Sequence, residues 1–198
     1  ETRQGMKREA APRQLPLDLR PVPGHSPDDL VVTPANAEAV DMVGRWPDWP
    51  TPVVVLAGPP GSGKSHLGAI WRERARAVQG STGELPAFID NAAEGELDET
   101  GLFHLVNAAR QAGSSILIAA RRFPAAWGLK LPDLASRLKA ATTVEIHEPD
   151  DALLAGVITK LFADRQIEVE PHVVSYLVRR IERSLATAID VVERLDAA

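Results

Sequence analysis

One stretch of the chain predicts its fold: Gly58-Pro59-Pro60-Gly61-Ser62-Gly63-Lys64-Ser65. Its glycines and the final Lys-Ser pair have the spacing of a phosphate-binding loop. The apolar run 52–57 comes directly before it and predicts a buried strand, while residues 66–76 come after it and predict a helix. A loop that joins a strand to a helix presents backbone N–H groups to phosphate oxygens.

The side chains of this loop have separate expected roles. Its glycines allow the backbone to approach phosphate closely, Lys64 adds a positive charge beside the β- and γ-phosphates, and the Ser65 hydroxyl reaches Mg²⁺. A plain Gly/Pro turn would explain the composition but not the full motif between a strand and a helix. The candidate nucleotide contacts here are Pro59, Pro60, Gly61, Ser62, Gly63, Lys64, Ser65 and His66.

Length and composition restrict the class of protein. A chain of 198 residues suffices for one α/β domain with a small appendage. The net charge of −5 argues against broad electrostatic binding of DNA, and the absence of cysteine excludes disulfides and thiolate metal sites. No apolar run has the length of a membrane helix, and the N-terminus lacks the apolar part of a signal peptide, so we expect a cytoplasmic protein with no membrane partner.

Residues 1–27 are rich in proline and charge and predict an extended tail. This tail contains the short apolar peptide Gln14-Leu15-Pro16-Leu17-Asp18-Leu19. Such a peptide, with several leucines and one glutamine, is typical of a segment that binds a groove on a partner protein. The alternative is that its leucines fold back onto the surface of the domain.

A second strand, 86–91, ends in a candidate metal-binding acid, Asp90. In phosphate-loop ATPases such an acid orients Mg²⁺, and the residue after it helps to polarise the attacking water. Here that residue is Asn91, whose amide cannot act as a general base. Glu94 is near in sequence, but its spacing does not favour it as a substitute.

The linker 78–85 is too short for a further helix and strand between the loop helix and the second strand. Either that unit is absent or a stretch is missing from this chain, and we favour the second explanation.

The rest of the chain completes an α/β pattern that ends in helices. Apolar periodicity predicts helices at 97–112 and 131–138 and strands at 115–120 and 142–146. Three further helices are predicted at 152–165, 171–181 and 184–197. The fold class is therefore α/β, a parallel sheet flanked by helices, with an α/β domain over 28–148 and a small helical lid over 149–198.

Together these segments resemble the DnaA/Hda branch of the AAA+ phosphate-loop NTPases, from about Gln14 to the C-terminus. The most specific matches are 58–67, 131–138 and the tail peptide. The resemblance implies that ADP or ATP binds with Mg²⁺ through Lys64, Ser65 and Asp90. It also implies that Leu30, Val31 and Val32, which precede a helix predicted to start near Thr33, lie over the adenine. An ordinary core strand is the plainer interpretation of those three residues.

Within this branch, the tail peptide and the lack of a further domain are similar to the Hda-type regulators. That similarity implies that 14–19 binds the DNA polymerase III β sliding clamp. It also implies that Arg137 is an arginine finger acting in trans on ATP bound to DnaA. The alternative for Arg137 is a surface ion pair. The similarity further implies a homo-oligomer and, without a helix-turn-helix domain, no direct sequence-specific DNA binding.

The chain departs from the family pattern at several positions. The lid arginine that normally contacts the phosphates falls on Ala186, with Arg183 as the nearest substitute. Arg121 stands near the usual polar sensor of the γ-phosphate, although Arg121 and Arg122 also suit solvated charges at a strand end. We therefore expect weak hydrolysis of the protein's own ATP.

Three functions are alternatives to the regulator. A self-assembling ATPase of the DnaA or helicase-loader type is the main alternative. A small-molecule kinase is disfavoured by the missing base and by the tail peptide. A metalloenzyme is disfavoured because the five histidines show no ligand spacing.

Overall fold

The computed structural model describes residues 30–80 and 84–197, so the predicted tail and its peptide 14–19 lie outside the described residues. In chain order the elements are α1 (Ala37–Gly44), β1 (Val53–Ala57), α2 (Lys64–Gln79), β2 (Ala87–Ala92), α3 (Glu99–Ala112), β3 (Ile116–Ala120), the 3₁₀ helix η2 (Pro124–Ala126), α4 (Pro132–Lys139), β4 (Thr142–Glu145), α5 (Asp151–Asp164), α6 (Pro171–Val178) and α7 (Leu185–Asp196).

The strands form one parallel sheet in the order β2-β3-β1-β4. Every residue of β1 and β3 is buried, which explains why these strands are continuous apolar runs rather than alternating ones. Because all the strands are parallel, the loops after β1, β2 and β3 leave the same edge of the sheet. Ligands of open α/β sheets bind at this edge.

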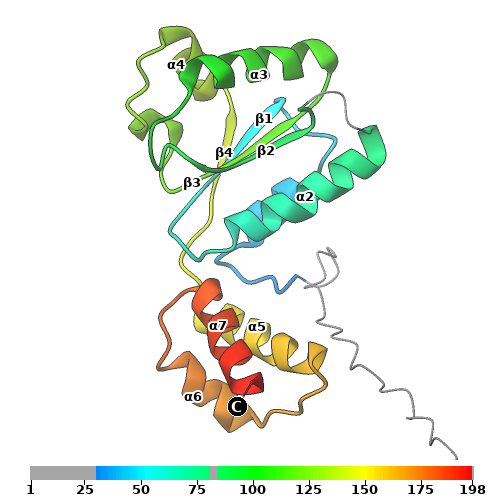
Figure 1. Ribbon diagram of the computed structural model, residues 1–198, viewed down its shortest axis with the longest axis vertical. Helices are drawn as coiled ribbons and strands as arrows, with labels where there is room; N and C mark the ends of the chain where they lie inside the picture. Colours follow the sequence, from blue (N-terminus) through cyan, green and yellow to red (C-terminus); the bar gives the residue numbers. More distant parts are fainter. Residues whose placement is uncertain (1–29, 81–83, 198) are drawn as a thin grey trace, which may run out of the picture.

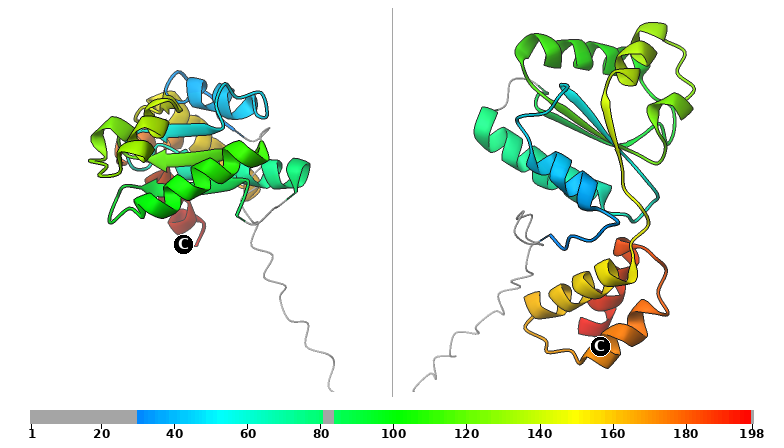
Figure 2. Two further views of the ribbon diagram at one scale, coloured as in Figure 1. Left: turned by 90° about the horizontal axis from the view of Figure 1, so that it is seen from above. Right: turned by 180° about the vertical axis from the view of Figure 1, so that it is seen from behind.

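Helices cover both faces of the sheet, as Figures 1 and 2 show. Alternate residues of β1 point to opposite faces: Val55 packs in the cluster under α3 and α4, and Val54 packs in the cluster under α1 and α2. The second cluster contains a tryptophan group in which Trp49 stacks on Trp71 at 5.2 Å and Trp46 meets Trp71 edge-on at 6.4 Å. The predicted doubly covered parallel sheet is therefore confirmed.

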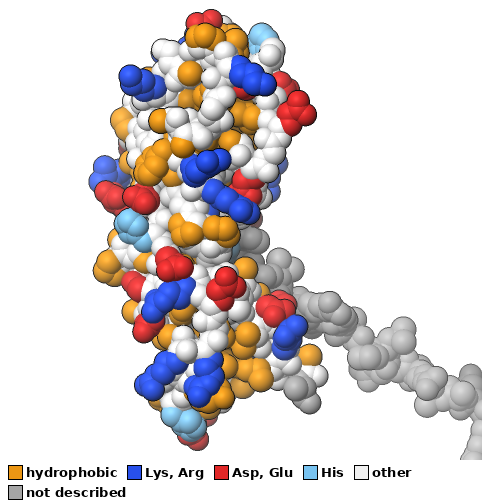
Figure 3. Space-filling view, turned by 90° about the vertical axis from the view of Figure 1, so that its left-hand side faces the viewer, with side chains coloured by type: hydrophobic (Ala, Val, Ile, Leu, Met, Phe, Trp, Pro, Cys, Tyr) orange, Lys and Arg blue, Asp and Glu red, His pale blue; other side chains and the backbone are white. Residues whose placement is uncertain are grey.

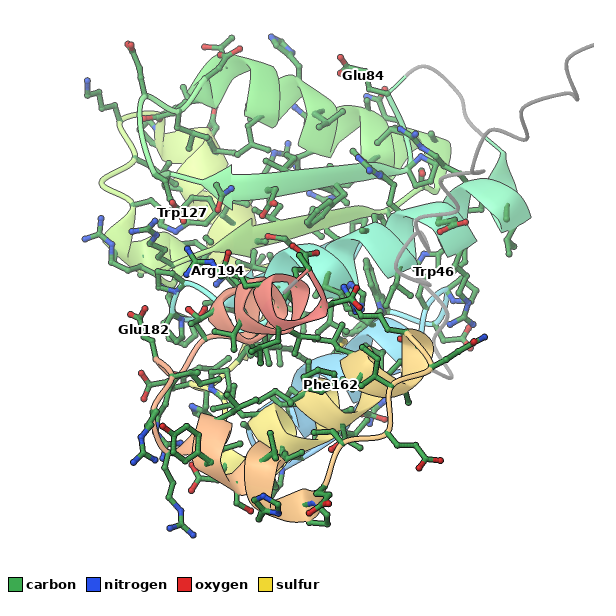
Figure 4. All side chains as sticks on the ribbon, turned by 60° about the horizontal axis from the view of Figure 1, so that its bottom comes forward. Trp46, Glu84, Trp127, Phe162, Glu182 and Arg194 are labelled. Atoms are coloured by element: carbon green, nitrogen blue, oxygen red, sulfur yellow. The ribbon has the colours of Figure 1, made fainter. Side chains whose placement is uncertain are left out.

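The C-terminal helices α5, α6 and α7 form a separate bundle below the sheet in Figure 1. The bundle has its own apolar core, marked by Phe162 in Figure 4. Its buried members are Leu154, Ile158, Phe162, Val174, Ala188 and Val192. The chain enters it from β4 through residues 146–150. No helix in the described part of the chain has the length and apolarity needed to cross a membrane.

Strand β2 lies at the edge of the sheet. Helix α2 ends at Gln79 and β2 begins at Ala87, with residues 81–83 outside the description. Among the described residues, no helix or strand lies between them. The crossover unit considered for the linker 78–85 thus has no counterpart in 30–80 or 84–197.

Candidate functional site

The phosphate loop occupies the turn between β1 and α2. At Gly58 an added Cβ would lie 2.2 Å from the Ile146 carbonyl oxygen, so only glycine fits there. Gly61 and Gly63 have φ of 71° and 98°, in the left-handed region. Helix α2 has Gly63 as its N-cap, no side-chain cap and no acidic residue in its first turn. Its first N–H groups and the positive end of its dipole therefore suit an anionic ligand.

Lys64 is buried against this loop with 6% of its surface exposed. Its Nζ donates to the carbonyl oxygens of Gly58 (2.8 Å) and Pro59 (2.6 Å) and to Ser62 Oγ (3.3 Å). All three acceptors are uncharged. Burial lowers the pKa of Lys64, and the negative charges of Glu94 and Asp90 oppose that shift. A buried cation held by neutral oxygens fits a site that takes phosphate.

The two candidate magnesium-site residues meet at the end of β2. Ser65 Oγ donates to Asp90 Oδ1 at 3.0 Å, and the same oxygen accepts the backbone N–H of Asn91 at 2.9 Å. Hard oxygen donors of this kind suit Mg²⁺. Within 30–80 and 84–197, no group of three or more His, Asp or Glu side chains is placed to hold a metal alone. Mg²⁺ would therefore need the phosphate oxygens of a nucleotide as further ligands.

Glu94 belongs to this site although its spacing in the sequence did not favour it. After Asp90, both Asn91 (φ 52°) and Ala93 (φ 58°) adopt left-handed backbone, and the pairing of β2 with β3 shifts register. In this turn the Glu94 N–H donates to the Asn91 carbonyl at 3.3 Å, and Glu94 Oε1 lies 2.8 Å from Arg121 Nε. Nothing in the sequence indicates left-handed backbone at an alanine, so no local signal predicts where Glu94 lies.

The lid contacts the phosphate loop directly, a feature that the sequence did not predict. The backbone N–H of Leu185, the first residue of α7, donates to the Gly61 carbonyl at 2.8 Å. A Cβ added to Gly61 would lie 2.1 Å from Ser184 Oγ, and one added to Gly63 would lie 3.1 Å from Leu185 Cδ1. Figure 4 shows α7 between the α/β layers and the rest of the lid.

Neither candidate for the lid arginine brings a guanidinium to the loop. Ala186 has none. Arg183 is bound elsewhere: it pairs with Asp151 Oδ1 at 2.7 Å, at the start of α5, and donates to the Pro149 carbonyl at 3.1 Å, in the segment that joins β4 to α5.

The segment considered for adenine lies at the junction of core and lid. The Val31 carbonyl accepts Asn36 Nδ2 at 2.9 Å, and a Cβ added to Gly156 of α5 would lie 2.7 Å from Val31 Cγ1. Leu30 packs against the core cluster on the α1 and α2 face, whereas Val32 is 53% exposed. The segment therefore contacts both parts of the molecule.

Arg137 lies on α4 with its guanidinium 5.3 Å from the centre of the Phe103 ring of α3. The residues that the structure describes give it no carboxylate partner, so the alternative of a surface ion pair is not observed. A cation held on an aromatic face keeps its N–H donors available to a partner.

A hollow of about 860 Å³ lies between residues 93–100 and 127–131, and its wall ends where α4 begins. It is lined by neither the phosphate loop nor Asp90. The Glu99 carboxylate closes one side by accepting the N–H groups of Lys130 (2.9 Å) and Leu131 (2.7 Å). Charges of both signs are intermixed on the face shown in Figure 3, with no continuous basic stripe.

Sequence comparison finds little. No family model matches the chain. An uncharacterised protein of Haemophilus influenzae is 28% identical over 101 residues, a match that covers 50% of this chain and 44% of that protein.

Several solved structures share the fold of this chain. Domain III of the replication initiation protein DnaA from Thermotoga maritima has a TM-score of 0.73 at 17% identity and 88% coverage of both chains. AMPPCP-bound DnaA from Aquifex aeolicus has a TM-score of 0.68 at 18% identity, covering 88% of this chain and 65% of that one. A RuvB variant from Thermotoga maritima has a TM-score of 0.62 at 18% identity and the same two coverages. The chain thus has the fold of the DnaA-like AAA+ domains.

Proposed function

We propose that this protein is an Hda-type regulator of replication initiation, which binds ADP or ATP with Mg²⁺ and stimulates hydrolysis of the ATP bound to DnaA. The observation that carries the proposal is the state of the phosphate loop. Lys64 is buried on neutral oxygens beside an uncapped helix start, while the groups that would drive hydrolysis in the same site are replaced or engaged.

The proposed nucleotide contacts come from the loop, from β2 and from the segment before α1. Lys64 and the first N–H groups of α2 would bind the β- and γ-phosphates, and Ser65 and Asp90 would hold Mg²⁺. Leu30, Val31 and Val32 would cover the adenine at the junction with the lid. The phosphates of the bound nucleotide would give the Lys64 ammonium group a negatively charged partner, in addition to its neutral acceptors.

Turnover by this site itself should be weak. Asn91, which stands where a second acid is usual, cannot accept a proton from water. Arg183 is bound inside the lid and its entry. These features favour a protein that holds its nucleotide and acts on the nucleotide of another subunit.

Arg137 is the group proposed to act on DnaA. It lies on the surface of α4, oriented by Phe103 and without a carboxylate partner among the described residues. A guanidinium that enters a neighbouring site stabilises the charge that develops on the γ-phosphate during transfer. The similarity of this fold to DnaA makes side-by-side packing of two AAA+ domains the expected arrangement.

The remaining partners are also proposals. The peptide 14–19 would bind the DNA polymerase III β sliding clamp by laying its leucines in an apolar groove, with Gln14 as the polar anchor. We further expect a homo-oligomer, with no membrane partner and no direct sequence-specific DNA binding. The protein would then reach DNA through the clamp.

The test measures hydrolysis of DnaA-bound ATP in the presence of clamp loaded on DNA. Arg137→Ala should lower the stimulated rate by about a thousandfold or to the unstimulated rate of DnaA, whichever is faster. The matched control is Lys139→Ala, which removes a charge from the same end of the same helix. Because Arg137→Ala also removes the contact with Phe103, Phe103→Leu serves as a second control. An unchanged rate in Arg137→Ala would exclude the proposed role.

The alternative is an ATPase that assembles with itself and hydrolyses its own ATP. The similarity of the fold to RuvB is the observation in favour of this alternative. Rapid steady-state turnover without DnaA, lost in Lys64→Ala, would support this alternative over the regulator.

A further inference from the structure

A second pair of charges lies at the same edge of the sheet as the phosphate loop. Glu94 follows β2 and Arg121 follows β3, and these neighbouring parallel strands end side by side. Glu94 Oε1 lies 2.8 Å from Arg121 Nε. The Glu94 side chain is only 21% exposed, whereas that of Arg121 is 56% exposed. The carboxylate is therefore the fixed partner, and the guanidinium has room to move.

This pair lies beside the phosphate loop. The backbone N–H of Gly58, the first residue of the loop, donates to the carbonyl of Ala120, the residue before Arg121, at 3.1 Å. The chain reaches Glu94 through two left-handed residues that are not glycine. Left-handed backbone at residues other than glycine persists where the surroundings hold it, often at functional sites.

Arg121 is held less firmly than the cations Lys64 and Arg183. Lys64 is held by Gly58, Pro59 and Ser62, and Arg183 is held by Asp151 and the Pro149 carbonyl. In the described part of the chain Arg121 has one carboxylate partner, and it lies partly in solvent, where an ion pair contributes little net free energy. A guanidinium binds phosphate as well as carboxylate, with bidentate geometry available in both cases.

We propose that Glu94 and Arg121 are an exchangeable pair that sets the preference of this site between nucleoside diphosphates and triphosphates. With a diphosphate bound, Arg121 stays on Glu94. With a triphosphate bound, Arg121 leaves Glu94 for the third phosphate, so part of the binding free energy is lost in breaking the pair. Glu94 therefore lowers the affinity for triphosphate and leaves that for diphosphate unchanged. This inference rests on the proposed nucleotide site.

Affinities for ADP and for a non-hydrolysable ATP analogue, measured with Mg²⁺ on the full chain, test the proposal. Glu94→Gln should raise affinity for the triphosphate analogue by about fivefold and leave ADP affinity unchanged. Arg121→Gln should lower affinity for the analogue alone. In the double variant, Glu94→Gln should no longer raise the affinity for the triphosphate analogue, because the Arg121 guanidinium that it releases is absent.

Arg122→Gln is the matched control, since it removes the same charge from the next residue and should leave the ratio of the two affinities unchanged. Thermal unfolding checks that each variant is folded. Arg121→Lys serves as a second variant, because it keeps the positive charge but loses the paired N–H donors of the guanidinium. Equal shifts for both nucleotides, or a gain that survives in the double variant, would overturn the inference alone. A wild-type chain that binds neither nucleotide would overturn the proposed function as well.

Discussion

Gly61 is the residue at which the phosphate loop and the lid meet. Its carbonyl accepts the Leu185 N–H at 2.8 Å, and its φ is 71°. A Cβ here would lie 2.1 Å from Ser184 Oγ and 3.0 Å from Ser184 Cα. The second contact is with backbone, so rotating the serine side chain cannot relieve the clash.

Gly61→Ala should therefore separate the lid from the loop. Left-handed backbone at alanine costs about 1–2 kcal/mol, and the clash with Ser184 adds to this cost. We expect a lower melting temperature and at least about a tenfold loss of ADP affinity, which corresponds to about 1.4 kcal/mol. Gly44→Ala is the control, because nothing lies within 4 Å of a Cβ at the end of α1. Wild-type affinity in Gly61→Ala would show that the contact has no part in binding.

At the scale of elements, Glu99 joins the start of α3 to the loop that leads into α4. Its carboxylate accepts the N–H groups of Lys130 and Leu131, and these hydrogen bonds lower the pKa of Glu99. The ionised form is thus the one that the fold prefers. This contact closes the hollow beside α4, the helix that carries Arg137.

The sign of this shift predicts a pH dependence. A carboxyl group whose pKa is lower in the folded state contributes stability above its unfolded value, about 4.3, and loses it as pH falls through the folded value. Glu99→Gln should therefore lower the melting temperature at pH 7 and have a smaller effect at about pH 3. Glu96→Gln, another acid lining the same hollow, is the control. An effect of Glu99→Gln that is independent of pH would contradict the assigned cause.

For the whole molecule, the relation between core and lid is the main feature. The lid has its own apolar core but contacts the α/β part at the loop through α7 and at Val31 through α5. In Figures 1 and 2 the residues joining β4 to α5 form the connection between the two parts. Nucleotide would bind where these contacts converge.

Gly156→Ala tests this arrangement. The new Cβ would lie 2.7 Å from Val31 Cγ1, so either the Val31 side chain or α5 must shift, and the contact with the segment proposed to cover adenine should weaken. Since alanine favours a helix over glycine by about 1 kcal/mol, α5 itself should stay intact. Hydrogen exchange should become faster in residues 30–35 and remain unchanged in the interior of α5. Unchanged exchange in both segments would show that the contact is not needed.

Much of the architecture followed from local patterns. Strands β1 and β3 were predicted within a residue of their observed starts because each is an unbroken apolar run. The starts of the lid helices were predicted within a residue as well, although α6 ends at Val178 rather than at 181. Helix α1 was less well placed: it starts at Ala37 rather than near Thr33, because the Asn36 side chain bonds to the Thr33 N–H and the Val31 carbonyl and holds a turn there.

The residues 58–65 and the acid at Asp90 were sufficient to predict a phosphate loop on a parallel sheet, because that motif depends on neighbours in the chain. The contacts of Glu94 with Arg121 and of Gly61 with the lid depend on residues far apart in sequence or on an unusual turn. Local propensity carries no information about such pairs. They exist because parallel strands bring their ends together and because the lid packs back onto the loop, so folding of the entire chain was needed to place them.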